Sequence, residues 1–378
     1  MVVNILDRDF REIFHLDTFE SLIWTERFTG YGEFELLLPL NSEAIQYAEI
    51  DNYLKLPDSD RLMIIETIEI DSSFEDGSKF KVSGRSLESI LTRRIVWNQT
   101  KIYGNIQGII EKVLNDSIIN PSIAERKIDN FILNTEITEN SVIEASWQDY
   151  IVHEGQIDEE DDTEDILDTN MSVEYTGDNV YDIIQEFCLA IPIGFKITVN
   201  EKGQFVFALY RGGNRTYDAN EFGKFVVFSP SYNNFSSSNY LNSKAEYKNV
   251  THVLGEGEGS EREELTVGDG RGLDRRELYT DARDLQSKLD DGSVLARKYY
   301  RNFLRQRGKE KLAEVQEIIS FEGEIEPERS FKYNEDYFIG DIVKIKNELG
   351  MSASVRITEI VRSQDSEGYK LYPTFEVI

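Results

Sequence analysis

Residues 33–39 read EFELLLP, and this stretch decides the character of the first part of the chain. Phe34, Leu36 and Leu38 stand at alternate positions, so in a strand their side chains share one face. The polar residues between them, Glu33 and Glu35, then lie on the opposite face. The stretch therefore predicts a strand with one face turned toward a core.

Two further strands are expected around this one. In the first, four apolar side chains would share a face: Leu62, Ile64, Ile68 and Ile70. In the second, Phe80 and Val82 alternate after the turn-like stretch Glu-Asp-Gly-Ser at 75–78. Residues 1–97 therefore predict a β-rich domain with a barrel-like or sandwich architecture.

The length of the chain predicts several domains. It has 378 residues and a mass of 43.7 kDa, which is too long for one ordinary core, so we expect about two to four domains. No apolar run is long enough for a membrane span, and the N-terminus lacks the pattern of a signal peptide. One cysteine, Cys188, excludes an intrachain disulfide, and three scattered histidines offer little for a transition metal.

The chain is strongly acidic, with 71 Asp and Glu against 41 Lys and Arg and a net charge of −30. Such a surface repels nucleic acid phosphates, which argues against sequence-specific DNA binding. Two interpretations of the charge remain. It could simply keep the protein soluble, or it could line a conduit through which DNA slides without sticking.

The hydrophobic period changes after residue 97. One amphipathic helix is predicted from five apolar residues, Ile106, Ile109, Ile110, Val113 and Leu114. A second helix is predicted over 180–191, with Asp178 as its cap and Pro192 just beyond its end. Strands at Phe195–Val199 and 205–209 follow, so residues 98–210 predict an α+β domain.

The remainder of the chain returns to β structure around one helix. Residues 293–312 are predicted to be helical, with Ala296, Tyr299, Tyr300 and Phe303 on one stripe. We predict that 211–275 together with 331–378 form a second barrel-like β domain, and that 276–330 is a helix-containing insertion. The predicted fold class is α+β, mainly β, with two barrel-like β domains and interspersed α+β domains.

The two β regions resemble each other in sequence. Residues 52–56 (Asn-Tyr-Leu-Lys-Leu) match 341–345 (Asp-Ile-Val-Lys-Ile), and 65–68 (Ile-Glu-Thr-Ile) match 357–360 (Ile-Thr-Glu-Ile). A glycine follows each second stretch at a similar distance, and an aromatic residue and a lysine come after it. The pattern predicts two similar β domains, so three chains could close a ring of six similar modules.

No motif nominates an active site or a metal site. The acidic run at 158–165 is either a solvated loop or, less favourably, a calcium site without the usual ligand spacing. Gly255–Gly259 lacks the Lys-Ser/Thr of a phosphate loop. Residues 268–274 resemble a calcium-binding nonapeptide repeat, but they occur once, and such repeats need stacked neighbours. Cys188 shares a helix stripe with apolar residues and is a core thiol rather than a nucleophile. His153 precedes a glutamate, but no HExxH motif occurs.

A basic stretch at 297–311 (RKYYRNFLRQRGKEK) interleaves cations with aromatics. Arg301, Arg305 and Lys309 lie four residues apart, away from the aromatic stripe, so a solvated or subunit-facing surface is favoured over nucleic-acid binding. Altogether the sequence predicts no catalytic residue, no cofactor-binding residue, no metal ligand and no cofactor. Paired carboxylates for glycoside hydrolysis stay open, because that chemistry is defined by separation in space.

The sequence resembles the siphophage tail-hub proteins, also called tail-associated proteins, which are related to the trimeric baseplate hubs of contractile tails. The resemblance rests on the order and spacing of short stretches: Gly30–Leu36, Ile64–Glu66, Val82–Leu87, Arg93–Val96, Phe195–Val199, Arg211–Thr216, Tyr247–Val250, Gly255–Gly259 with Glu261-Arg262, Arg275–Glu277, Asp336–Val343 and Pro373–Phe375.

Physical roles are predicted for some of these residues. Gly84 and Gly340 suit backbone bends at strand ends. Tyr337 and Phe338 would supply buried aromatic area. Arg85 and Arg94 would pair with carboxylates at a domain or subunit contact.

The resemblance implies a structural role in the virion. Such a protein would form a homotrimer with two barrel-like domains per chain, seated below the distal tail protein ring at the tail tip. Its lumen would hold the end of the tape-measure protein and later pass phage DNA without specific binding or stable membrane insertion. Assembly would take place in the host bacterial cytoplasm. Because the chain ends just after the last hub-like strand, a receptor-binding or lytic module is expected either on a separate tip protein or outside this sequence.

Two rival functions remain from the sequence. A cell-wall hydrolase used in entry would need a nucleophile or metal constellation, which the sequence does not nominate. A carbohydrate-binding adhesin at the tail tip would need exposed aromatics in β loops, for which Tyr232, Phe235 and Tyr240 are candidates.

Overall fold

The computed structural model shows an α+β fold that is mainly β and contains several sheets. It describes residues 1–73, 77–138, 171–217, 219, 225–259, 262–287, 297–325, 331–347, 349–350 and 352–378. Within this part, the chain forms two compact units. The first comprises residues 1–138, 171–239 and 321–378, and the second comprises residues 240–320.

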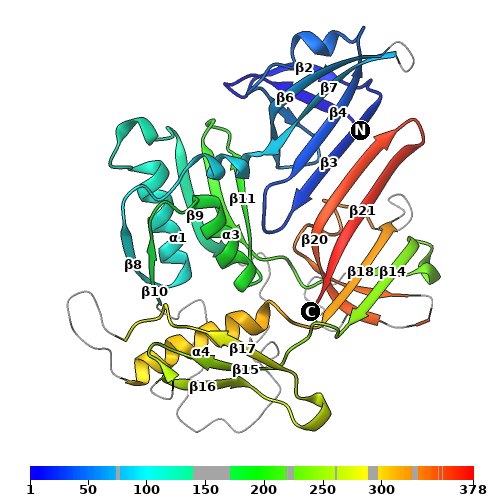
Figure 1. Cartoon of the computed structure of the whole chain (residues 1–378). Helices are drawn as coiled ribbons and strands as arrows, with labels where there is room; N and C mark the ends of the chain where they lie inside the picture. The colour runs from blue at the N-terminus through cyan, green and yellow to red at the C-terminus, as the bar shows by residue number, and fades with distance from the viewer. Residues whose placement is uncertain are drawn as a thin grey trace. The chain divides into compact units, whose positions relative to one another are not determined.

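One large sheet dominates the first unit (Figure 1). Its strands come from both ends of the chain: β1 (Val3–Leu6), β2 (Glu12–Leu16), β3 (Ser21–Arg27), β4 (Glu33–Pro39), β5 (Tyr53–Lys55), β6 (Leu62–Ser73), β7 (Gly77–Ser86), β13 (Val227–Phe228), β14 (Phe235–Ser243), β18 (Ile318–Ile325), β19 (Ile342–Lys346), β20 (Ser352–Asp365) and β21 (Gly368–Val377). The order is β14-β18-β21-β20-β3-β4-β7-β6-β5-β1-β2, and β19 pairs with both β20 and β13. In the described residues β14 and β2 end the path without pairing each other, so the predicted barrels are not closed.

The predicted repeat is confirmed by the strand registers. Tyr53 lies opposite Ile64, and the corresponding Ile342 lies opposite Arg356. The order β3-β4-β7-β6-β5-β1 in the first β region matches the order β14-β18-β21-β20-β19-β13 in the second. One pairing differs in direction, because β1 is antiparallel to β5 whereas β13 is parallel to β19.

A β-bulge lies at the same place in both repeats. The β6–β7 register shifts between Ile65 and Thr67, and the β20–β21 register shifts between Ile357 and Glu359. The prediction that Leu62, Ile64, Ile68 and Ile70 share one face of a strand is wrong, because the extra residue of the first bulge turns the side chains after it to the other face. Leu62 and Ile64 pack in one core, while Ile68 packs in another, so the four residues do not share a face.

The middle of the chain forms the predicted α+β region within the first unit. Its elements are β8 (Thr100–Gly104), α1 (Ile106–Leu114), β9 (Phe131–Thr138), β10 (Met171–Tyr175), α3 (Val180–Ala190), β11 (Gly194–Val199) and β12 (Phe205–Tyr210). Strand β12 is central between β11 and β9, and β8 pairs with β10. The short helical turns among the described residues are η1 (Glu43–Gln46), η2 (Leu87–Arg93), η3 (Asn115–Ile119), η4 (Ala124–Arg126), η5 (Pro230–Tyr232) and η7 (Gly272–Asp274).

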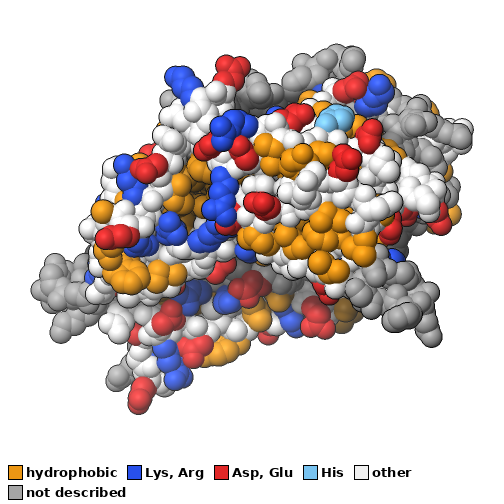
Figure 2. Space-filling view, turned by 90° about the horizontal axis from the view of Figure 1, so that it is seen from above, with side chains coloured by type: hydrophobic (Ala, Val, Ile, Leu, Met, Phe, Trp, Pro, Cys, Tyr) orange, Lys and Arg blue, Asp and Glu red, His pale blue; other side chains and the backbone are white. Residues whose placement is uncertain are grey.

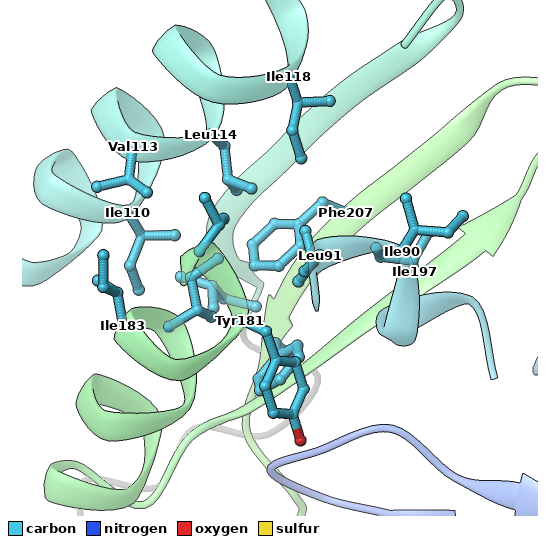
Figure 3. Packing of buried hydrophobic residues seen from close by; sticks show 14 of the residues in the cluster. Ile90, Leu91, Ile110, Val113, Leu114, Ile118, Tyr181, Ile183, Ile197 and Phe207 are labelled. Atoms are coloured by element: carbon cyan, nitrogen blue, oxygen red, sulfur yellow. The ribbon is translucent and has the colours of Figure 1, made fainter. Parts of the chain in front are cut away.

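Both predicted helices of this region are confirmed, with one correction at a cap. The apolar stripe of α1, including Ile110 and Val113, packs against Ile183 of α3 and Phe207 of β12 (Figure 3). The N-cap of α3 is Asn179, whose side chain accepts a hydrogen bond from the Tyr181 amide. The predicted cap, Asp178, instead accepts from the Thr176 amide at 2.7 Å.

The second unit is a small sheet with one helix. Strands β15 (Val250–Leu254), β16 (Glu264–Gly268) and β17 (Glu277–Asp281) pair in the order β16-β15-β17. Helix α4 (Arg297–Ala313) contributes Tyr300 and Leu304 to a core with Val253 and Val267. The predicted domain boundary at 275/276 falls inside this sheet, because β15 pairs with β17. The division into four domains stays a prediction.

Candidate functional site at the junction of the two β regions

Strands β3 and β20 join the two β regions into one sheet (Figure 1). They pair antiparallel over six residues of each strand, from Leu22 opposite Gln364 to Arg27 opposite Glu359. The Arg27 guanidinium contacts the Glu359 carboxylate at 2.6 Å and reaches Glu33 of β4 at 3.2 Å. We call this contact the junction, and its side chains form the candidate site.

The junction contains a buried carboxylate, Glu26. It accepts hydrogen bonds from the Arg362 guanidinium at 2.7 Å, the Tyr333 hydroxyl at 2.7 Å and the Ser59 hydroxyl at 2.8 Å. The indole N–H of Trp24 adds a fourth bond at 3.0 Å. A buried charge is tolerated when it is paired and its lone pairs are satisfied, and Glu26 meets both conditions.

The electrostatics of Glu26 follow from this arrangement. Burial favours the protonated acid, but Arg362 and Arg61 outweigh it, helped by the hydrogen bonds from Tyr333 and Ser59. The net effect lowers the pKa of Glu26 below its ordinary value. Arg362 itself is only 1% exposed and also contacts the more exposed Asp58 at 2.8 Å. At neutral pH the cluster is therefore ionised and held as a fixed charge network.

A second buried pair ties the middle region to the first β region. Arg61 contacts Glu88 of η2 and donates a hydrogen bond to the Tyr210 hydroxyl of β12 at 2.9 Å. Glu88 also accepts from the Ile197 amide of β11 at 3.0 Å. One carboxylate therefore fixes η2 and β11 to the loop that precedes β6.

Phe28, which follows β3, is enclosed by glycines. A Cβ atom added at Gly194 or at Gly340 would lie 2.5 Å from the Phe28 ring. The Phe28 amide donates to the Thr358 carbonyl at 2.9 Å, and its carbonyl accepts from the Phe195 amide at 3.2 Å. Three segments far apart in sequence thus meet at one ring, and they meet closely because two of them carry no side chain there.

Asp341 holds the start of the last β hairpin. Its carboxylate accepts from the Gly213 amide at 2.6 Å and the Phe338 amide at 2.9 Å, and it contacts the Arg215 guanidinium. Burial raises the pKa of Asp341 more than Arg215 lowers it. The residue therefore positions the backbone of the segment that leads into β19.

The ionisable groups of the site contact one another and the backbone around them. The clustered ionisable groups are enclosed by side chains, and a shallow groove of about 460 Å³ lies at the end of the β3–β20 pair, beside Phe19, Leu37 and Asp365. In the part of the chain that the structure describes, no group of three or more His, Cys, Asp or Glu side chains could hold a metal ion. No helix in these residues is long and apolar enough to cross a membrane.

The sequence matches the model of one protein family over residues 2–375, described as Siphovirus ReqiPepy6 Gp37-like protein. The chain belongs to this family. Its resemblance to siphophage tail-hub proteins is thereby confirmed, and the chain is a siphovirus or prophage tail protein. Among curated proteins, none matches it.

Solved structures of tail proteins share the fold of this family member. The tail protein from Neisseria meningitidis MC58 aligns with a TM-score of 0.57 at 11% identity, over 99% of this chain and 96% of that chain. The 43 kDa tail protein of prophage MuSo2 from Shewanella oneidensis gives 0.57 at 11% identity, over 99% and 98%. The prophage tail protein gp18 from Listeria monocytogenes gives 0.54 at 10% identity, over 99% and 94%.

The predictions for two glycines and two aromatic residues are confirmed in part. Gly340 has a φ of +90° just before β19, which confirms a bend there. Gly84 instead lies inside β7, where a Cβ would meet the Ile64 carbonyl at 1.8 Å, so it permits close approach at the bulge rather than a strand end. Tyr337 is buried as predicted, whereas Phe338 is exposed beneath the Arg215 guanidinium.

The two predicted arginines also differ. Arg85 donates to both oxygens of Glu66, at 2.7 and 2.9 Å, which confirms a carboxylate partner within the first β region. Arg94 donates to the carbonyls of Arg126 and Arg93, so its described hydrogen bonds go to backbone rather than to a carboxylate.

The structure describes some of the motifs that the sequence analysis set aside. Cys188 is fully buried in the core with Ile184 and Ile191, and burial raises the pKa of its thiol, so the core interpretation is confirmed. Gly255 packs under Tyr300, where a Cβ would lie 2.4 Å from the hydroxyl. The acidic run at 158–165 and His153 lie outside the described residues.

The basic stretch forms α4, and part of it pairs within the second unit. Arg297 and Arg301 both contact Glu263, and Arg307 contacts Asp284. Tyr300 is buried as predicted, but Phe303 is 39% exposed, and Ala296 lies outside the described residues. Three aromatic residues were proposed for an adhesin. Of these, Tyr232 is exposed, Tyr240 is half-buried and Phe235 is buried.

The junction residues were missed by sequence reasoning. Glu26 and Arg362 are separated by 336 positions and belong to different repeats. A local signal did exist, because an arginine at an inward position of an alternating strand, as at Arg362, needs a buried anion.

Proposed function

We propose that this tail protein is the hub at the tail tip. Three copies would form a ring that joins the six-fold tail tube to a three-fold tip and closes the DNA channel. The observation that carries the proposal is the internal repeat, whose two β regions share strand order, register and bulge position. Two similar modules per chain let a three-fold ring present six similar surfaces.

The junction supports this role. A ring of six modules closes only if each module is rotated against the next by a fixed angle. Within the chain, that angle is held by a shared sheet, by the buried Glu26–Arg362 pair and by the packing of Phe28. Each chain would therefore enter assembly as a preformed pair of modules.

The proposed partners follow from the position of such a ring. On one side lies the distal tail protein ring, and the lumen receives the tape-measure protein and later the DNA. The net charge of −30 fits a channel that repels phosphate, so DNA would pass without stable binding. The proposed role is structural, without catalysis, and its location is the tail tip of the virion.

The proposal is tested by the native mass of the purified chain. Light scattering after size exclusion, at two salt concentrations, is expected to give a trimer of about 131 kDa, three times the 43.7 kDa of the chain. Electron micrographs along the three-fold axis are expected to show six similar lobes. A chain that stays monomeric at high concentration, or forms a dimer, contradicts the trimeric ring.

A further inference from the structure

Two apolar side chains are exposed just after η2, at the start of the middle region. Trp97 is 56% exposed and Ile95 is 38% exposed, whereas Val96 between them is buried. Because side chains alternate along an extended segment, Ile95 and Trp97 both point away from the core that Val96 enters. A tryptophan this exposed is uncommon, since its ring is one of the largest apolar surfaces that a side chain carries.

The backbone of this segment is held by hydrogen bonds to the residues that lead into α3. The Val96 amide donates to the Asp178 carbonyl at 2.9 Å, and the Val96 carbonyl accepts from the Gly177 amide at 2.8 Å. The Arg94 carbonyl accepts from the Val180 amide at 3.0 Å. The two exposed side chains are therefore presented by a fixed backbone, which reduces the entropy lost when they bind a partner.

Three arginines lie beside these side chains. The Arg126 guanidinium lies over the Trp97 ring, 5.4 Å from its centre, and donates to the Ile95 carbonyl at 2.5 Å. Arg94 donates to the carbonyls of Arg126 and Arg93 at 3.0 Å each. Among the residues that the structure describes, neither Arg94 nor Arg126 forms an ion pair with a carboxylate.

Carbonyl oxygens satisfy the N–H groups of these arginines but do not neutralise their charge. Burial, together with the positive charges of Arg126 and Arg93, lowers the pKa of Arg94. Arg93 reaches Glu66 only at 3.4 Å, and that carboxylate already binds Arg85 through both oxygens. Basic and acidic side chains usually mix on a surface, as they do on the face shown in Figure 2. The arginines beside the exposed tryptophan depart from this mixing, in a chain whose net charge is −30.

Arginine beside tryptophan is the combination typical of the energetic centre of a protein interface. We call Arg93, Arg94, Ile95, Trp97 and Arg126 the arginine–tryptophan surface. We propose that this surface docks on another tail protein, whose carboxylate bonds to Arg94 and Arg126 while an apolar side chain covers Trp97. The carboxylate that the sequence predicted for Arg94 would then come from another chain.

A different protein fits this surface better than the alternatives. A nucleic acid would meet the repulsion of a chain with a net charge of −30. A second copy of the chain carries many carboxylates, but the proposed ring is built from the repeated β regions, and this surface lies outside the repeat. The choice of partner therefore rests on the proposed function, whereas the surface itself does not.

The first test identifies the partner in assembled tails. A photoreactive residue, p-benzoylphenylalanine, replaces Trp97 in the full chain, purified tails are irradiated, and cross-linked peptides are identified by mass spectrometry. The expected product joins position 97 to a peptide of a different tail protein that contains Asp or Glu. The matched control carries the photoreactive residue in place of Tyr279 of β17, which is also 56% exposed, and should not cross-link to that peptide. If the chain changed at position 97 does not enter tails, the photoreactive residue replaces the exposed Asn98 instead.

The second test measures the affinity of the purified full chain for the cross-linked tail protein. Removing the charged donors of an interfacial pair predicts that Arg94→Gln combined with Arg126→Gln weakens binding by roughly thirty-fold or more. The control, Arg271→Gln with Arg305→Gln, removes the same charge from exposed positions of the second unit and should leave the affinity unchanged. Ile95→Glu places a carboxylate among the arginines, so it should weaken binding as strongly while circular dichroism shows a folded chain.

The outcomes separate this surface from the proposed ring. Cross-links from position 97 to another copy of the chain, to DNA or to nothing in assembled tails overturn the docking, whether or not the chain is a trimer. An affinity that falls no further in Arg94→Gln with Arg126→Gln than in the control overturns the charge pairing. A monomeric chain that still gives the cross-link to a different tail protein contradicts the ring and supports the surface.

Discussion

Removing Arg362 should be among the most damaging single changes in this protein. Arg362→Met keeps most of the apolar stem but leaves Glu26 buried without its direct ion partner. Breaking a buried pair by removing one partner typically costs about 3–5 kcal/mol of folding free energy, because the remaining charge stays desolvated. Arg61 and three neutral donors still face Glu26, which places the expected loss near the lower end, at about 3 kcal/mol.

The matched control is an exposed ion pair with a similar N–O distance. Arg8 contacts Asp51 at 2.8 Å, and its side chain is 68% exposed, so Arg8→Met should cost less than about 1 kcal/mol. Urea unfolding is measured through tryptophan fluorescence, to which Trp24, the indole that donates to Glu26, contributes together with Trp97 and Trp147. Glu26→Gln combined with Arg362→Met should recover about 2 kcal/mol of the loss, because it removes the unpaired charge.

The pH dependence gives a second readout of the same pair. In the wild type the pKa of Glu26 is lowered, so its contribution to stability is present at neutral pH and is lost as pH falls through that value. In Arg362→Met burial should raise this pKa, so the variant gains stability as pH falls through the raised value. The difference between the two proteins should narrow from pH 7 toward pH 5. A constant difference, or a loss no greater than that of Arg8→Met, would refute the reasoning.

Three further predictions concern single contacts. Gly340→Ala should lower the free energy of unfolding by more than about 2 kcal/mol, because φ is +90° there and the new Cβ would clash with the Phe28 ring. Gly368 has φ +121° but open space around it, so Gly368→Ala should show only the cost of backbone strain. Thermal unfolding measures both. The Cys188 thiol should stay unreactive toward a thiol reagent until the chain unfolds, because it is buried and its pKa is raised; fast labelling of native protein would contradict this. Tyr300→Phe should cost about 1 kcal/mol by removing hydroxyl bonds to the Glu256 amide and the Leu285 carbonyl, and an unchanged melting curve would count against that role.

Local periodicity predicted most of the elements of the fold. The stripe that includes Ile110 became α1, and the alternation in EFELLLP became β4, because each pattern needs only neighbours in sequence. The repeat was also visible, since Asn52 and Asp341 occupy the same hydrogen-bonded position beside a bulge. These features are encoded within short segments, so composition and spacing were sufficient to find them.

Features that depend on pairing between distant segments were missed or mistaken. The bulge at Glu66 changes the face of every later residue in β6, and no local pattern in the strand announces it. Asp178 and Asn179 are both good caps, and only the backbone path decides between them. The junction joins Glu26 to Arg362 across nearly the whole chain, so its existence depends on which strand edges meet.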